Sequence, residues 1–192
     1  MTGQTGNPSL SQAKILRWVL AINLGFFFIE MTTGLLSRSM GLVADSLDML
    51  ADALVYALSL WATGRSGIQK KRVATWSGFF QMILAVLGLL EVLRRFIEVR
   101  TPPDYQVMIG VSILALGANI LCLVLLQKAR CREAHIRASL IFTANDVIIN
   151  SGVILAGILV LLTGSRYPDL VVGGIVFLIV VRGALRILKL GK

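Results

Sequence analysis

Six long apolar segments, separated by short polar loops, run through the chain of 192 residues. Each segment has about 20 residues, which is the length an α-helix needs to cross the hydrocarbon core of a bilayer. The chain is 56% hydrophobic and only 15% charged, whereas a soluble domain has about 25% charged residues. The pattern predicts an all-α polytopic membrane protein, a six-transmembrane-helix bundle with spans over residues 15–36, 41–63, 76–97, 105–127, 136–162 and 168–188.

The basic residues are distributed unequally between the two sides of the membrane that this pattern creates. Of the 19 Lys and Arg residues, 14 lie at segment ends that share a side with both chain termini. Cytoplasmic loops carry such an excess, so we expect both termini in the cytoplasm and the protein in a bacterial inner (plasma) membrane. The same rule accounts for the net charge of +9, and no nucleic-acid partner is expected. Residues 1–13 are predicted to form a flexible tail and residues 14–192 the six-helix transmembrane domain.

Acidic residues inside the apolar segments are the most informative ones, because each costs at least about 2.5–3.5 kcal/mol at mid-membrane. Asp45, Asp48 and Asp52 are spaced by three and four residues, which places them on one face of a helix. Their segment holds no basic residue, so three carboxylates in a low dielectric need protons or a cation. Oxygen ligands suit the harder divalent cations. Two other segments contribute polar residues: Asn23 and Glu30 in the first, and Asn145, Asp146 and Asn150 in the fifth.

Several of these residues also have plainer interpretations. Asp45 lies near the outer end of its segment and could reach the headgroups or cap its helix. Asp146 and Asn150 could each hydrogen-bond to a neighbouring helix. Asn145 points about 100° away from Asp146 on a helix, which favours an interhelical hydrogen bond over a metal contact. Glu30 could relay protons, orient a ligand or pair with another polar group.

Two stretches of the sequence resemble the cation diffusion facilitator family. The first begins at Asn23 and continues through Glu30 and Ser37-Arg38-Ser39 to Ala44-Asp45-Ser46-Leu47-Asp48-Met49-Leu50-Ala51-Asp52. The second is Asn145-Asp146 followed by Asn150-Ser151-Gly152-Val153-Ile154-Leu155-Ala156. The resemblance covers all six helices in order. The chain is similar to a short form of the family, with the transmembrane domain only and without the cytoplasmic C-terminal domain that many members carry.

The resemblance also implies a metal site. Members of the family use two residues four apart on helix two, which correspond to Asp48 and Asp52, and a His-x-x-x-Asp pair on helix five, which corresponds to Phe142 and Asp146. Phe142 cannot ligate a metal, and Asn150 could supply the missing oxygen from one turn further along the helix. The implied ligands are Asp48, Asp52, Asp146 and Asn150, with Glu30, Asp45 and Asn145 as residues that orient ligands or relay protons.

The function implied by the resemblance is efflux of a divalent metal cation in exchange for protons, by a homodimer in the lipid bilayer. Zinc, cobalt, cadmium, iron, manganese and nickel are all open as the transported ion, and no cofactor is expected. The alternative is a non-transporting accessory or sensor subunit of the same fold that has lost one ligand at Phe142. An enzyme is not expected, because the apolar segments contain no Ser/His or Cys/His pair and His135, the only histidine, lies in a basic loop.

Overall fold

The structure, a computed structural model, describes residues 8–61, 67–98, 101–128 and 134–190. These residues form six α-helices and no strand, as the sequence predicted. Five of the helices are long and apolar enough to cross a membrane. The helices are α1 (Pro8–Ser37), α2 (Met40–Trp61), α3 (Gly67–Ile97), α4 (Tyr105–Lys128), α5 (Ala134–Thr163) and α6 (Tyr167–Leu190).

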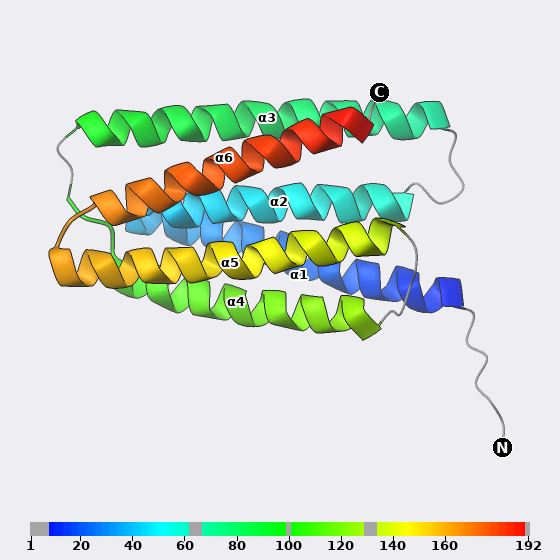
Figure 1. The fold of residues 1–192 in the computed structure, drawn as a ribbon, viewed down its shortest axis with the longest axis horizontal. Coiled ribbons are helices and arrows are strands. Elements are labelled where there is room, and N and C mark those ends of the chain that lie inside the picture. The colour runs from blue at the N-terminus through cyan, green and yellow to red at the C-terminus, as the bar shows by residue number, and fades with distance from the viewer. Residues whose placement is uncertain (1–7, 62–66, 99–100, 129–133, 191–192) are drawn as a thin grey trace, which may run out of the picture.

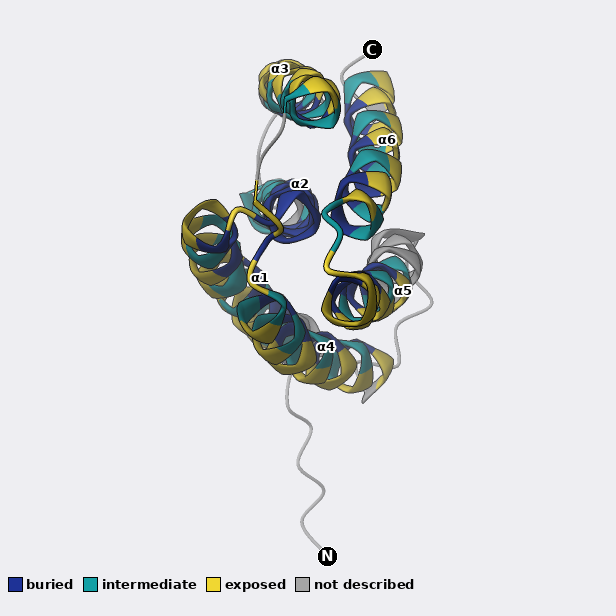
Figure 2. Cartoon of the chain, turned by 90° about the vertical axis from the view of Figure 1, so that its left-hand side faces the viewer, coloured by how far each residue is buried: buried dark blue, intermediate teal, exposed yellow. Residues whose placement is uncertain are grey.

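The exception among the six is α2, which has 22 residues but carries three aspartates. Figure 2 shows α2 in the middle of the bundle, buried around most of its circumference, while α1, α3 and α4 turn exposed faces outward. Ionisable residues in membrane helices almost always face the interior of the bundle. The surrounding helices therefore give the most polar helix a protein environment in place of lipid.

The helices pack chiefly as α1 with α2, α3 with α6 and α4 with α5, and α6 also packs on α2. Figure 1 shows that α1 begins and α6 ends at the same end of the bundle, as an even number of spans requires. We call this the inner end, where the sequence places the cytoplasm, and we call the opposite end the outer end.

The turns at the outer end lie where the sequence predicted them. α1 ends at Ser37, Arg38 adopts a φ of 60°, and α2 begins at Met40. Gly164, directly after the end of α5, has a φ of 61°, which glycine adopts without steric cost. The Ser39 hydroxyl accepts a hydrogen bond from the Leu42 N–H at 3.1 Å and caps α2.

Two helices begin well before the predicted spans, while the other ends differ by only a few residues. α1 begins at Pro8, so residues 8–13 are helical and the predicted tail is shorter by that segment, while α3 begins at Gly67. Hydropathy detects only the part of a helix in the hydrocarbon, and a helix can continue through the headgroups with polar side chains. The division of the chain into a tail and a transport domain stays a prediction.

Glycines allow α3 and α6 to pack closely. A Cβ atom on Gly88 of α3 would lie 2.1 Å from Cε1 of Phe177, which is fully buried on α6. A Cβ atom on Gly78 would lie 2.7 Å from Cγ of Leu188. Leu188 lies more than two turns beyond Phe177, toward the inner end of α6. These two contacts, far apart along both helices, make α3 and α6 a tightly packed pair.

Candidate metal centre

Asp169 is buried at the start of α6, and five further acidic side chains are buried in the interior of the bundle. Their residues are at most 9% exposed: Glu30 on α1, Asp45, Asp48 and Asp52 on α2, and Asp146 on α5. None of these five forms an ion pair with a described basic residue, and the ion pairs of Glu91, Arg94, Arg95 and Glu98 lie on α3. The buried carboxyl groups therefore have no basic side chain as an ion-pair partner in the described part of the chain.

Asp48 and Asp146 come together across the interface between α2 and α5. Their carboxyl groups are close enough to interact with each other, and Asp52 is close enough to interact electrostatically with both. Two adjacent carboxylates in a low dielectric repel strongly unless a proton or a cation lies between them. The Tyr56 hydroxyl donates a hydrogen bond to Oδ2 of Asp52 at 3.4 Å.

This arrangement brings two carboxyl groups together but does not form a complete set of metal ligands. Within the described residues, no three His, Cys, Asp or Glu side chains gather closely enough to hold a metal ion. The predicted ligand set of Asp48, Asp52, Asp146 and Asn150 therefore stays a prediction, and full ligation would need a further approach of α2 and α5.

The two asparagines of α5 occupy different environments. Asn150 is fully buried, and its side-chain nitrogen donates a hydrogen bond to the backbone carbonyl of Asp146 at 3.0 Å. Its side-chain oxygen has no hydrogen-bond partner in the described structure. Asn145 is half-buried and lines a cavity. The side chains of Phe142 and His135 lie outside the described part, so the structure does not test the predictions about them.

Glu30 and Asp45 form a second contact between acidic side chains. Their carboxyl groups, both fully buried, are close enough to interact electrostatically. No described donor from another residue type reaches any of their four oxygen atoms. The interpretation in which Asp45 reaches the headgroups is wrong, because this residue is 0% exposed. α2 is capped by other residues.

A cavity of about 260 Å³ between α2, α5 and α6 reaches Asp48. It lies toward the inner end, since its α6 residues belong to the second half of that helix. Its lining residues are Asp48, Asn145, Ile148, Ile149, Ile179, Arg182, Gly183 and Arg186. The cavity gives water and ions a place next to one carboxyl group of the Asp48–Asp146 pair.

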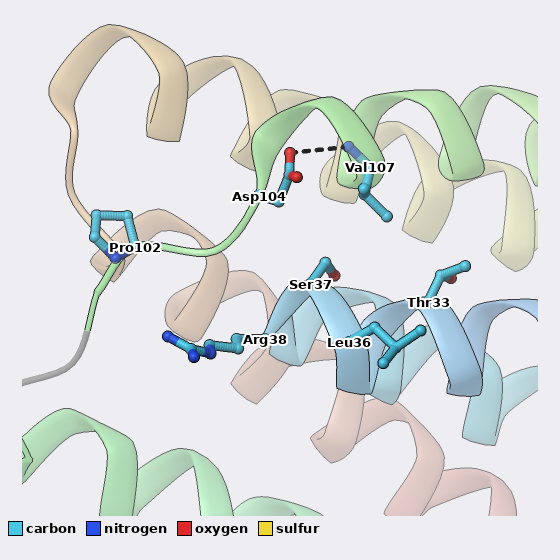
Figure 3. A pocket seen from close by; sticks show the side chains of 7 residues that line it. All are labelled: Thr33, Leu36, Ser37, Arg38, Pro102, Asp104 and Val107. Atoms are coloured by element: carbon cyan, nitrogen blue, oxygen red, sulfur yellow. Dashed lines mark hydrogen bonds between the residues drawn. The ribbon is translucent and has the colours of Figure 1, made fainter.

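A larger cavity, of about 460 Å³, lies at the outer end between the last turn of α1 and the start of α4 (Figure 3). Its one carboxylate, Asp104, accepts hydrogen bonds from the N–H groups of Gln106 and Val107 at 2.9 and 3.3 Å. Asp104 therefore caps α4. None of the five buried acidic residues lines this cavity.

Two buried polar residues that hold α2 in place were missed by the sequence analysis. Gln81 of α3 donates a hydrogen bond to the backbone carbonyl of Leu47 at 2.7 Å. Asp169 of α6 is bound to the start of α2. The sequence did contain a signal for both, namely a polar side chain in an apolar segment. Gln81 lies inside one such segment, and Asp169 follows Pro168 at the start of another.

Comparison with known proteins identifies the family of this chain. A family model described as the cation efflux transmembrane domain matches residues 16–191. The chain belongs to this family. The resemblance to the cation diffusion facilitators is thereby confirmed. With its membrane-spanning helices, this cation efflux domain is an integral inner-membrane protein.

Curated relatives of this cation efflux domain carry names of metal transporters. The zinc transporter ZitB of Escherichia coli is 29% identical over 194 residues, which are 95% of this chain and 62% of that protein. The metal cation efflux system protein CzcD of Cupriavidus metallidurans is 23% identical, over 81% of this chain and 53% of its own length. The cadmium, cobalt and zinc/H(+)-K(+) antiporter of Bacillus velezensis is 25% identical, over 93% and 61%. The chain thus spans about three fifths or less of each of these relatives.

Proposed function

We propose that this chain exports a divalent metal cation from the cytoplasm and that the Asp48–Asp146 pair is the centre of its transport site. The observation that carries the proposal is that two buried carboxyl groups from different helices lie near each other, with no basic ion-pair partner among the described residues, beside a cavity that lies toward the inner end. A divalent cation would relieve the repulsion within this pair. The names of the relatives point to the same cargo.

The metal enters through the inner cavity and first meets Asp48, which is the only carboxylate among the described residues that line it. Asp146 then binds from α5, Asp52 from the next turn of α2, and Asn150 through its unpartnered side-chain oxygen. Carboxylate and amide oxygens of this kind ligate divalent cations. Zinc, cadmium and cobalt are the first candidates, because these metals appear in the names of relatives.

Proton exchange follows from the same pair of carboxyl groups. Without metal, Asp48 and Asp146 can stay in contact only if a proton lies between them. A metal ligand must be deprotonated, so metal binding releases that proton. The site then holds either metal or protons when it faces each side in turn. An antiporter among the relatives, named for H(+) and K(+) exchange, supports this step.

We also propose a homodimer in the lipid bilayer. Small residues permit close approach of helices, but Gly173 is occupied by packing within one chain, since a Cβ on it would lie 2.8 Å from the carbonyl carbon of Met40. A Cβ on Gly152 would contact Val172 of the same chain at 3.7 Å. The dimer surface therefore lies elsewhere. Mass measurement in lipid nanodiscs tests the proposal, and a mass of one protomer alone would reject it.

Zinc uptake into liposomes that contain the purified protein and a zinc-sensitive dye tests the transport proposal. We expect uptake by the wild type, background uptake by Asp146→Asn, and unchanged uptake by Asp104→Asn. The last variant is the matched control, because Asp104 lies in the outer cavity and asparagine also caps helices. Zinc binding without uptake by the wild type would favour the accessory or sensor subunit, and absence of both would reject a metal function.

A further inference from the structure

The carboxylate of Asp169, in the first turn of α6, receives three hydrogen bonds from the start of α2. Its Oδ1 accepts from the Ser39 hydroxyl at 2.6 Å and from the Gly41 N–H at 2.9 Å, and its Oδ2 accepts from the Met40 N–H at 2.7 Å. The first N–H groups of a helix have no partner within the helix, and a negative charge there is stabilised by the helix dipole. A residue of one helix thus caps another helix, and it is only 1% exposed.

The backbones of the two helices also touch at this point. Gly173 follows Asp169 by one turn, and a Cβ on it would lie 2.8 Å from the carbonyl carbon and 2.9 Å from the carbonyl oxygen of Met40. A Cβ on Gly41 would lie 3.0 Å from Oδ1 of Asp169. The outer ends of α2 and α6 are therefore joined by hydrogen bonds and by direct backbone contact.

The inner ends of the same helices are arranged differently. There the cavity of about 260 Å³ separates α2, α5 and α6 and reaches Asp48. α6 is meanwhile packed tightly on α3 through Phe177 and Gly88. A change in the width of the inner cavity therefore moves α6 and α3 together, while the contact at Asp169 keeps the outer end of α6 in place.

We propose that Asp169 is a positioning residue that fixes α6 to α2 at the outer end, and that the α3–α6 pair pivots about this contact when the inner cavity opens and closes. Asp169 binds no metal in this scheme. It acts through α2, because it fixes the start of the helix that carries Asp48 and Asp52. The proposal rests on the transport function proposed above.

A disulfide that replaces the contact provides the first test. Asp169→Cys alone should lower zinc uptake by about tenfold or more under reducing conditions, since small displacements of a site are costly. The double variant Ser39→Cys/Asp169→Cys should behave likewise when reduced and recover most of the uptake when oxidised. The native cysteines do not interfere, because Cys122 is buried in α4 and Cys131 lies in the loop predicted at the inner end. Each single variant, oxidised and reduced, is the control.

Three outcomes of this test would overturn the proposal. They are wild-type uptake by reduced Asp169→Cys, a disulfide confirmed by mass spectrometry that leaves uptake low, and failure of the disulfide to form in the folded protein. The last would mean that the two side chains are not adjacent in the membrane. Absence of uptake by the wild type would reject the transport function itself. This outcome differs from the three above, which reject only the role of Asp169.

A second experiment leaves Asp169 intact, so it does not depend on the folding of its variants. Ile148→Cys/Gly183→Cys places one thiol on each side of the inner cavity, at an exposed residue of α5 and at a glycine with open space around it. A short reversible bis-methanethiosulfonate reagent that joins them should block zinc uptake, and reduction should restore it. Each single variant, treated alike, measures the effect of modification alone, and the block in the cross-linked double variant should exceed it, since both residues line the cavity through which the metal is proposed to enter. Full uptake by the cross-linked protein would show that the inner ends do not move and would overturn the pivot.

Discussion

Asn150 donates its side-chain N–H to the backbone carbonyl of Asp146, and this bond orients its side-chain oxygen, which stays buried without a partner in the described structure. An amide held in this way is pre-organised as an oxygen ligand, because its rotation is already restricted. Asp146 and Asn150 lie one turn apart on the same face of α5. That Asn150 compensates for Phe142 stays a prediction, and it can be tested at this side-chain oxygen.

We predict that Asn150→Ala lowers zinc affinity by about tenfold in the native protein and by clearly less in the Phe142→His background. The introduced imidazole would take over the vacant ligand position, and it should also raise the preference for zinc over manganese. Calorimetry on the four proteins of this double-mutant cycle gives the interaction free energy. Equal effects of Asn150→Ala in both backgrounds would exclude Asn150 as the substitute ligand.

Asp48→Asn and Asp52→Asn are each expected to reduce zinc uptake to background while the proteins still insert and purify. Removal of a buried carboxylate eases insertion into the bilayer, so the loss would reflect the site and not the fold. The measurement is initial uptake into liposomes, compared at equal amounts of inserted protein. Near-wild-type uptake by both variants would mean that α2 does not carry the transport site.

Zinc affinity should fall as the pH falls, because protons compete with the metal for the Asp48–Asp146 pair. For the same reason, an acidic interior should drive zinc into inverted vesicles, whose cytoplasmic face is outside. Calorimetry in buffers of different ionisation enthalpy counts the protons released per zinc bound. If no proton is released and imposed pH gradients of either sign leave uptake unchanged, the protein is a uniporter.

Gly88→Ala should destabilise the protein by about 1–3 kcal/mol. The new methyl group would collide with the buried ring of Phe177, since the Cβ position is 2.1 Å from a ring carbon. Gly110→Ala is the matched control on α4, because nothing lies within 4 Å of that position. Thermal denaturation in mild detergent measures both variants. Equal midpoints would show that α3 and α6 pack less closely than the structure indicates.

The sequence predicted the six helices because hydropathy and length determine them locally. It also predicted that Asp45, Asp48 and Asp52 share one face, since that follows from the helical period alone. The contact of Asp48 with Asp146 could be inferred only through the family resemblance, because helical period does not say which helices are neighbours.

The contact of Asp169 with α2 could not be predicted in this way. It joins residues separated by about 130 positions, and nothing in the local sequence of α6 names α2 as its partner. Likewise, nothing in the sequence around Gly173 indicates that it packs on Met40 of its own chain. A small residue permits close approach, but its sequence context does not identify the helix that approaches.

The close packing of Gly88 on Phe177 has a consequence for biosynthesis. α3 is completed at Ile97, but its partner α6 is completed only at Leu190, roughly ninety residues later. At a synthesis rate of about 5–20 residues per second, α3 waits about 5–20 s in the bilayer for this partner. α1 and α2, which are adjacent in sequence, can associate at once. During this interval the groove beside Gly88 is open to lipid, and a lipid chain must leave it before the ring of Phe177 can enter.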